Sequence, residues 1–526
     1  MKRIKITKAN DVKGYLEEVT GRSLEELLDT SGTYNVDKLD VVSDKLNNAA
    51  KKGTFITFVG DYDSDGINSL AILIFIAQKI GAKFKVRIPK RNSEGYGFSL
   101  PIAAEIPDNS LVVCIDNGIV AFDAISEVKR RGCEVIVIDH HAKGETLPEA
   151  DIIIDPEAIG GADFTHYCGA GLAYKLAVYM FGENSDVALK ALPYATIGTI
   201  GDVVSLTGDN RKIVKQGIQA IKNGGGTVGL QTLCRMNGVN EVTTATDIAF
   251  SIVPILNAPG RLEDNGAVKA LAPIILDFGF DEMLSELIAT NTLRKDLTNA
   301  IVKSLDIDSL RDNDNKCVVL YYEKMIPGLA GIIAGKLAEE TRKPSIVFTG
   351  SGEIKGSARN PIDELNLIET LRNTGLLIEG GGHPGAAGLS IKQEDLNLLI
   401  STFDKLIGEQ IPVINTEKVI EYNLEVEGKD VPAVSTDIFS LQPFGEGFPE
   451  PVLRVSDDIV SIKWMGSNKQ HLRITCNGYN IIAFNTEVNA DLVIKAKKVR
   501  AIGTISQNYF NGNVSLQLKA KDVEFF

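Results

Sequence analysis

Between residues 55 and 156, short apolar runs alternate with helical stretches, and this rhythm constrains the fold more than any other feature of the chain. Most of these runs are continuous in Val, Ile and Leu instead of alternating with polar residues, which indicates strands covered on both faces. The strand-length runs are residues 55–59, 84–88, 111–115, 135–138 and 152–154. We therefore predict an α/β domain with a mostly parallel sheet and crossover helices.

Acidic residues follow several of these runs. Parallel sheets bind ligands beyond the carboxyl ends of their strands, so side chains that follow different strands are expected to converge there. The residues are Asp61, Asp63 and Asp65 after the first run, Asp116 after the third, Asp139, His140 and His141 after the fourth, and Asp202 farther along the chain. Carboxylates gathered in one pocket repel one another unless divalent cations lie among them. Carboxylates with imidazole and no thiolate suit manganese or magnesium better than structural zinc.

The Asp-x-Asp-x-Asp-Gly pattern that begins at Asp61 also opens calcium-binding EF-hand loops. The twelfth position of such a loop needs a bidentate carboxylate, but here it is Ile72. The pattern also follows an apolar strand instead of a helix. These two differences exclude an EF-hand and favour a two-metal phosphoesterase, in which one carboxylate can bridge the ions.

The rest of the chain predicts further domains, because 526 residues suggest about three. Residues 281–310 place apolar side chains on one face at helical spacing. Beyond residue 412, short alternating segments and turn signals such as Asn477-Gly478 and Asn511-Gly512 predict a small β barrel. The expected parts are an N-terminal helical segment (1–50), the parallel-sheet domain (51–275), a connecting helix (276–312), a smaller α/β domain (313–411) and an all-β module (412–526).

Composition limits the class of protein. A hydrophobic content of 44% excludes a disordered chain, and six cysteines without a Cys-x-x-Cys pair exclude a zinc ribbon. The longest apolar run, residues 70–77, is too short to cross a bilayer, and no apolar segment follows the charged N-terminus, so we expect a cytoplasmic protein. The net charge of −14 argues against indiscriminate nucleic-acid binding. It does not exclude a nucleic-acid substrate, because a metal site itself carries much of the negative charge.

With these motifs the chain resembles the DHH phosphoesterase superfamily, named for its Asp-His-His triplet, and specifically its RecJ-like single-strand exonucleases, which have DHH, DHHA1 and OB-fold domains. Further segments fall in the order expected of that family: residues 168–175, 257–262, 356–360, 380–384 and 443–447. Pro259, Asn360 and Phe448 depart from its usual pattern. None of the three is a candidate metal ligand.

The resemblance implies a role for each candidate residue. Two divalent cations, Mn²⁺ in preference or Mg²⁺, would be bound by Asp61 or Asp63 together with Asp65, Asp116, His140 and Asp202. Asp116 would bridge the ions and His141 would face the phosphate, which makes Asp116, His140 and His141 the catalytic residues. The implied substrate-binding residues are Arg261, Ser357, Arg359, Asn360, Gly381, Gly382 and His383.

The implied function is hydrolysis of phosphodiester bonds in single-stranded DNA, from 5′ to 3′ with release of mononucleotides, in DNA repair and recombination. A monomer that works with a single-strand-binding protein and a repair helicase is expected. Two alternatives stay open: a phosphodiesterase of cyclic dinucleotides or nanoRNA, and a non-catalytic replication scaffold. The extra β module argues against the first, and the intact acidic residues argue against the second. In that module, Tyr509 and Phe510 are the aromatic residues expected to stack on bases.

Overall fold

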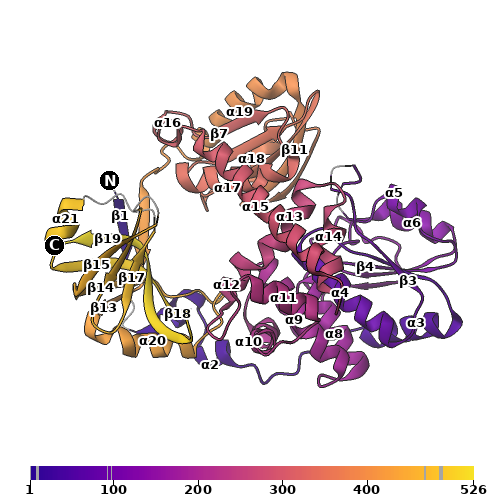
Figure 1. The fold of residues 1–526 in the computed structure, drawn as a ribbon. Coiled ribbons are helices and arrows are strands. Elements are labelled where there is room, and N and C mark those ends of the chain that lie inside the picture. The colour runs from indigo at the N-terminus through magenta and orange to yellow at the C-terminus, as the bar shows by residue number, and fades with distance from the viewer. Residues whose placement is uncertain (1, 7–10, 92, 96, 467–469, 485–489) are drawn as a thin grey trace.

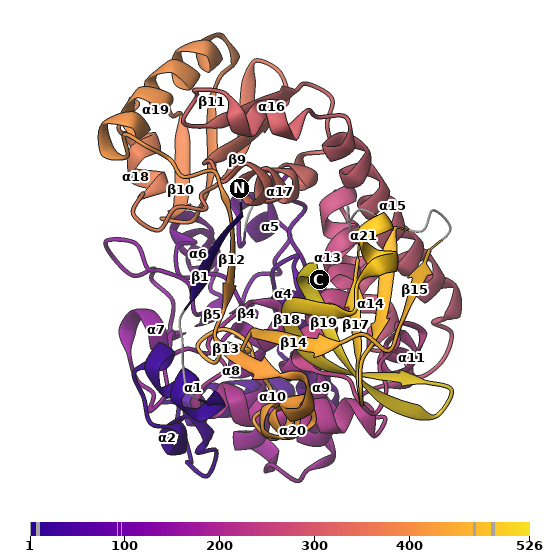
Figure 2. The same cartoon turned by 90° about the vertical axis from the view of Figure 1, so that its left-hand side faces the viewer.

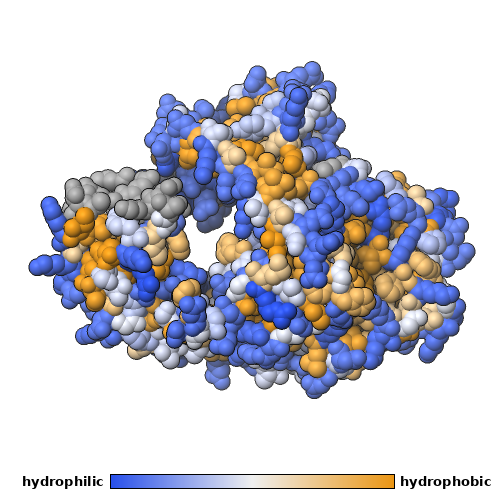
Figure 3. Space-filling view, in the orientation of Figure 1, coloured by the Kyte–Doolittle hydropathy of each residue, from blue (hydrophilic) through white to orange (hydrophobic). Residues whose placement is uncertain are grey.

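The computed structural model describes residues 2–6, 11–91, 93–95, 97–466, 470–484 and 490–526. Three sheet-containing parts surround a central space (Figure 1). The first lies at the right of that view, the second at the top, and the C-terminal part at the left. Figure 3 shows that an opening remains between the three parts when every side chain is drawn.

The first part is built on a five-stranded parallel sheet in the order β3-β2-β4-β5-β6. Alternate residues of β4 enter two different cores: Val113 packs with the helices on one face and Val112 with those on the other. This arrangement confirms the predicted α/β class. The strands are β2 Ile56–Val59, β3 Phe84–Arg87, β4 Leu111–Ile115, β5 Glu134–Ile138 and β6 Ile152–Ile154. The helices are α3 Leu39–Lys52, α4 Ser64–Lys79, α8 Gly169–Phe181 and α9 Asp186–Gly201 on one face, and α5 Leu100–Ala104 and α6 Phe122–Arg130 on the other.

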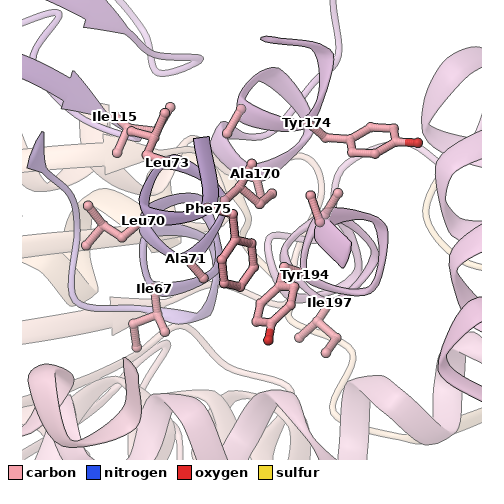
Figure 4. Close-up of a cluster of buried hydrophobic side chains, with 14 of the residues drawn as sticks. Ile67, Leu70, Ala71, Leu73, Phe75, Ile115, Ala170, Tyr174, Tyr194 and Ile197 are labelled. Atoms are coloured by element: carbon pink, nitrogen blue, oxygen red, sulfur yellow. The ribbon is translucent and has the colours of Figure 1, made fainter. Parts of the chain in front are cut away.

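Helix α4 lies at the centre of the larger core. Every residue from 64 to 77 is buried, because the sheet covers one side of the helix while α8 and α9 cover the other. Figure 4 shows this cluster, in which the rings of Phe75 and Tyr194 meet edge to face at a centroid distance of 5.1 Å. The helix begins where Asp63 caps it by accepting from the backbone N–H groups of Asp65 and Gly66. Its start is therefore fixed against the core, and the acidic loop before it is fixed as well.

Further helices lead from this domain to the second part. Helix α15 spans Asp281–Lys303, and α16, capped by Asp306, follows at Ile307–Asp312, so the single helix predicted to residue 310 is two helices. Among the described residues, no helix combines the length and apolar character needed to cross a membrane. The helices between α9 and α15 are α10 Gly208–Lys222, α11 Val228–Met236, α12 Ala245–Ser251, α13 Val253–Leu262 and α14 Gly266–Ile274.

The second part contains a five-stranded mixed sheet in the order β10-β11-β9-β8-β7. Only β7 and β8 are parallel; the other neighbours are antiparallel. The strands are β7 Val318–Tyr322, β8 Ser345–Thr349, β9 Glu353–Arg359, β10 Glu379–His383 and β11 Ala386–Lys392. The helices are α17 Ala330–Thr341, α18 Leu367–Arg372 and α19 Leu396–Gln410.

The C-terminal part is a seven-stranded sheet in the order β13-β14-β18-β19-β17-β16-β15, mostly antiparallel. It also contains helix α20, Val431–Ser440, and the short helix α21, Ala490–Lys495, so it is not made of strands alone. The long hairpin of β18 and β19 extends beyond the rest of this part (Figure 2). The strands are β13 Leu424–Glu427, β14 Leu453–Asp458, β15 Ser461–Met465, β16 His471–Thr475, β17 Asn480–Ala483, β18 Lys498–Phe510 and β19 Asn513–Phe525.

The first residues of the chain join the last domain, which the sequence analysis did not predict. Strand β1, Lys2–Ile6, pairs in parallel with β12, Lys418–Tyr422. The helices that follow, α1 Val12–Thr20 and α2 Leu24–Leu28, contribute Leu16 and Leu27 to the C-terminal core. Helix α3, in contrast, packs on the parallel sheet. The first fifty residues are thus divided between two cores.

Candidate metal centre

The ends of β2, β4 and β5 bring the predicted acidic and histidine residues together. Three overlapping groups have ligand atoms within 4.8 Å of one another. Asp116 belongs to two of these groups, and so does His140. The groups are Asp61, Asp63 and Asp116; Asp65, His140 and Asp202; and Asp116, His140 and His141. Every residue that the sequence analysis proposed as a metal ligand therefore lies in one cluster.

Backbone N–H groups orient the carboxylate of Asp65. Its two oxygens accept from Gly169 at 2.6 Å and from Ala170 at 2.9 Å, both at the beginning of helix α8, where a negative charge is favourable. Close packing explains the glycine in this motif: a Cβ at Gly169 would lie 2.6 Å from the Cβ of Asp116 and 3.0 Å from Oδ2 of Asp65. A Cβ at Gly198 would come within 2.7 Å of Oδ1 of Asp65. Helices α8 and α9 thus form a close wall around the acids.

Asp116 lies at the end of β4 in the left-handed backbone region, with φ of 59°. This conformation is uncommon for residues other than glycine and is concentrated at functional sites. Its Oδ1 is 3.0 Å from Nε2 of His140, and the same nitrogen is 3.7 Å from Oδ2 of Asp65 and 3.7 Å from Oδ2 of Asp202. Nε2 of His140 therefore faces three carboxylates. Burial lowers the pKa of His140, which favours the neutral ring that binds metals.

Asp139 orients the histidines. Its Oδ1 is 2.7 Å from Nδ1 of His141 and accepts from the backbone of His140, and its Oδ2 accepts from Ile119. Although burial opposes the charged ring, the hydrogen bond and the charge of Asp139 raise the pKa of His141 to about 9. These interactions favour the positively charged form of His141, which is suited to a phosphate oxygen.

The acids of the cluster disfavour one another's charge. Burial, followed by the charges of neighbouring carboxylates, raises the pKa of Asp63 and raises the pKa values of Asp61 and Asp116 well above the ordinary range. The same causes raise the pKa of Asp202 to about 8. Within the described part of the chain, Oδ1 of Asp61 is also buried without a hydrogen-bond partner. Divalent cations would supply the missing positive charge and the missing partner, so this donor set fits them.

The charge of Arg91 acts on arginines from two domains, and one of these, Arg261, is also affected by the charge of Asp63. Burial and then the charge of Arg91 lower the pKa of Arg261, which lies on α13, and the same two causes lower the pKa of Arg359 in the second domain. Arg294 of the connecting helix α15 also acts on Arg261. The guanidinium of Arg91 lies 4.7 Å from the ring centre of Tyr62. Positive charges that act on one another in this way favour the binding of an anion such as phosphate.

The second domain places its other predicted contact residues in different surroundings. Ser357 lies on β9 near the start of α17, because a Cβ at Gly331 would be 3.6 Å from its Oγ. A Cβ at Gly381 would meet nothing within 4 Å, and Gly382 and His383 beside it are exposed on the edge strand β10.

Asn360 has a different environment. Its amide donates to the carbonyl oxygens of Ile362, Leu365 and Pro384 and accepts from the N–H of Ile362. These bonds hold the loop after β9. The predicted contacts of all these residues with a substrate stay predictions.

The sequence analysis missed two roles within this region. In the sequence, Arg91 is one of several basic residues between positions 83 and 91, and its action on both Arg261 and Arg359 depends on the packing of two domains. The role of Asp139 as the partner of His141 has a sequence signal, because two adjacent residues follow the same strand end. A metal-site histidine commonly has such a carboxylate partner.

The comparisons with known proteins agree with this geometry. Residues 55–199 match the model of the DHH family, N-terminal domain; residues 314–409 match the DHHA1 domain; and residues 423–522 match the RecJ OB domain. The single-stranded-DNA-specific exonuclease RecJ of Thermus thermophilus is 30% identical over 485 residues, which are 91% of this chain and 70% of that protein. The chain belongs to the RecJ family. This confirms the resemblance read from the motifs.

Other members of the RecJ family extend the comparison. The Bacillus subtilis protein of the same name is 29% identical over 496 residues, 91% of this chain, and this chain spans 62% of its length. A crystal structure of Thermus thermophilus RecJ in complex with Mn²⁺ has a TM-score of 0.82 and 26% sequence identity, and covers 99% of this chain and 79% of that chain. The RecJ fold therefore extends over all three parts of this molecule.

Proposed function

We propose that this protein is a metal-dependent exonuclease that hydrolyses phosphodiester bonds of single-stranded DNA. One observation carries the proposal: a cluster of acids and histidines that fits divalent cations includes Asp63, whose charge acts on Arg261, and the charge of Arg91 acts on both Arg261 and Arg359 of the second domain. The relatives in the RecJ family are named for this activity. Action from the 5′ end, with release of mononucleotides, is the direction that we propose.

The metal centre is proposed to hold two divalent cations, Mn²⁺ in preference or Mg²⁺. Asp61 or Asp63, with Asp65, His140 and Asp202, would hold them. Asp116 and His140 each belong to two of the three groups, and of these two only the carboxylate of Asp116 has two oxygens with which to serve both ions, which supports its assignment as the shared ligand. Bound cations of this kind lower the pKa of a water molecule and stabilise the charge of a reacting phosphate. The backbone N–H groups of Gly169 and Ala170 orient the carboxylate of Asp65.

The residues around the metal centre would bind and orient the strand. Arg261 and Arg359 can pair with phosphate oxygens through their planar guanidinium groups, with Ser357 beside them. Protonated His141, held by Asp139, would donate to an oxygen of the reacting phosphate. The open backbone at Gly381, with Gly382 and His383 beside it, would approach a neighbouring phosphate. Because these groups come from two domains, the substrate would lie between them.

The C-terminal domain would bind the strand at a distance from the metal centre. Residues 451–526 contain ten Lys or Arg against six Asp or Glu. Phe510 is 69% exposed and Tyr509 is 36% exposed near the tip of the β18–β19 hairpin, where both can stack on bases. Tyr479, in contrast, is buried and donates to Asp457, so it belongs to the core. The stacking role is assigned to Tyr509 and Phe510.

The test is digestion of single-stranded DNA labelled at either end, with Mn²⁺, by the wild type, Asp116→Asn and the matched control Asp123→Asn. Asp123 is an exposed acid on α6. We expect mononucleotides from the 5′ end with the wild type and the control, and no cleavage with Asp116→Asn. Cleavage only of cyclic dinucleotides or short RNA would replace the proposal by the small-substrate alternative. Absence of any metal-dependent cleavage would point to a scaffold.

The cellular setting is also part of this proposal. Work with a single-strand-binding protein and a repair helicase, as a monomer in the cytoplasm during DNA repair and recombination, rests on membership of the RecJ family. Sedimentation of the purified protein with and without single-stranded DNA measures the oligomeric state. A stable dimer in either condition would contradict the proposed monomer.

A further inference from the structure

The turn that follows β4, residues 116–119, is tied to the neighbouring strand β5. The N–H of Asp116 donates to the carbonyl oxygen of Ile138 at 3.0 Å, and the N–H of Ile119 donates to Oδ2 of Asp139 at 3.0 Å. On its other side β4 pairs with β2. The turn therefore lies between the two other strand ends that supply candidate metal ligands.

The side chain of Asn117 connects this turn to β2. It is 1% exposed, and its Nδ2 donates to the carbonyl oxygen of Val59 at 3.1 Å and to that of Ile115 at 2.8 Å. Val59 is the last residue of β2 and lies two residues before Asp61. Ile115 is the last residue of β4 and lies directly before Asp116. One carboxamide therefore holds the backbone of two strand ends that carry candidate ligands.

The backbone on both sides of Asn117 has an uncommon conformation. Asp116 has a φ of 59°, and a residue other than glycine keeps this left-handed form only where its surroundings hold it. Gly118 has a φ of 115°, and a Cβ there would lie 2.8 Å from that of Cys114. The turn is thus closely packed on its own strand. The hydrogen bonds of Asn117 restrain the backbone next to the strained residue.

Half of the Asn117 carboxamide has no partner. Among the residues that the structure describes, Oδ1 of Asn117 is buried without a hydrogen bond, and a Cβ at Gly97 would lie 3.9 Å from it. Burial of an unpaired acceptor costs free energy, so an apolar side chain of similar shape would suit this space better if filling it were the only need. The two N–H donors are therefore what asparagine contributes here.

We propose that Asn117 is a positioning residue for the metal centre: its amide holds Asp116 in the left-handed form and fixes the end of β2 against the end of β4. Asp116 is then oriented before the ions bind, so its carboxylate meets both of them without rearrangement of the backbone. The inference rests on the proposed function in one respect, that Asp116 is the shared metal ligand. All the groups involved belong to the parallel-sheet domain, so the effect does not depend on the C-terminal part.

The test uses the full-length protein with Asn117→Leu and a matched control, Asn237→Leu. Leucine has the branched outline of asparagine but no N–H donor and no charge. Asn237 ends helix α11, donates to the carbonyl oxygen of Leu233 at 2.8 Å, and belongs to none of the three groups of candidate ligands. Electron paramagnetic resonance gives the dissociation constant of Mn²⁺ from the free ion, and the signal of the bound ions distinguishes a bridged pair from separate ions. Digestion of single-stranded DNA gives kcat and KM.

Loss of the amide donors should act on the metal centre and not on strand binding. We expect Asn117→Leu to raise the Mn²⁺ dissociation constant and lower kcat, each about 10- to 100-fold, as for other residues that orient metal ligands. KM should stay close to the wild-type value, because the proposed contacts with the strand come from other residues. The bound ions should give the signal of separate ions instead of a bridged pair. The control should match the wild type in all four measurements.

A purely structural role of Asn117 predicts a different result. Asn117→Leu would then keep the wild-type Mn²⁺ affinity, bridged-pair signal and kcat in its folded fraction, and only its melting temperature would fall. That result would overturn the inference. If the wild type binds Mn²⁺ but cleaves no DNA, the proposed function fails, and the Mn²⁺ affinity and the signal of the bound ions still decide whether Asn117 positions the site.

A second variant, Asn117→Ser, carries the test if Asn117→Leu does not fold. Serine is smaller and has a single hydroxyl donor, so it can bond at most one of the two carbonyl oxygens that Asn117 holds. We expect weaker Mn²⁺ binding and a lower kcat than in the wild type, with KM unchanged. Wild-type Mn²⁺ affinity and kcat in folded Asn117→Ser would contradict the proposed role of the amide.

Discussion

Asp202→Asn should stabilise the metal-free protein at high pH while it removes a metal ligand. The pKa of Asp202 is raised from 3.8 to about 8, by burial and then by the charges of Asp65 and Asp63. One pKa unit corresponds to about 1.4 kcal/mol, so a shift of about four units sets an upper limit of about 6 kcal/mol. The side chain is 23% exposed, and neighbouring acids share the protons. We therefore expect about 2–3 kcal/mol.

The direction of the pH dependence follows from proton binding. Above pH 3.8 the carboxyl of Asp202 ionises in the unfolded chain, whereas the folded protein keeps its proton until about pH 8. The folded state then binds more protons, so the free energy of unfolding falls as pH rises through this window. Asparagine resembles the protonated carboxyl and does not titrate, so the substitution removes this contribution.

The assay is urea unfolding in EDTA at pH 5 and pH 8, for the wild type, Asp202→Asn and the exposed control Asp123→Asn. Between these two pH values the free energy of unfolding of Asp202→Asn should rise by about 2 kcal/mol relative to the wild type. Mn²⁺ should reverse the order at pH 8, because it binds the ionised carboxylate. If the free energies of unfolding of the wild type and Asp202→Asn differ equally at both pH values in EDTA, burial and the neighbouring acids do not raise the pKa of Asp202.

Three further predictions concern the walls of the site and the strand. Gly169→Ala places a Cβ 2.6 Å from that of Asp116, so the Mn²⁺ affinity measured by calorimetry should fall about 10- to 100-fold. The control Gly408→Ala, whose added Cβ would make only ordinary contacts, should leave the Mn²⁺ affinity unchanged. Arg359→Met should raise KM and reduce the slope of log affinity against log salt concentration by about 1; an unchanged slope would exclude a phosphate contact. Phe510→Ser should weaken binding of a long strand by about 1–3 kcal/mol and leave a dinucleotide unaffected; equal losses for both would refute stacking at the hairpin.

The parallel sheet and its acidic edge were predictable because both depend on local patterns. Strands such as residues 111–115 are continuous in apolar residues, and a strand covered on both faces needs that composition. Once the strands are parallel, Asp61 and Asp116 must lie at the same edge of the sheet, and in the structure their strands, β2 and β4, are neighbours. The convergence of the candidates that follow strands therefore needed no knowledge of tertiary contacts, whereas the position of Asp202 depends on the packing of helix α9.

Features that depend on contacts between distant segments were not predictable. Strand β1 pairs with β12, more than 400 residues away, and its residues carry no signal for that partner. Arg211 reads in the sequence as an ordinary polar residue of an amphipathic helix, yet it is buried by the C-terminal domain. Tyr479 follows the Asn477-Gly478 turn and Tyr509 lies just before the Asn511-Gly512 turn, and only the fold separates the buried ring from the exposed one. In each case the partner domain decides the environment.

The central claim is that the acids and histidines at the sheet edge hold the catalytic cations. Anomalous X-ray scattering from a crystal soaked in Mn²⁺ tests it most directly. We predict two peaks, about 3.5–4 Å apart, among Asp65, Asp116, His140 and Asp202, with Asp61 or Asp63 beside them. Peaks that lie away from this cluster, or none at Mn²⁺ concentrations that support cleavage of single-stranded DNA, would contradict the account.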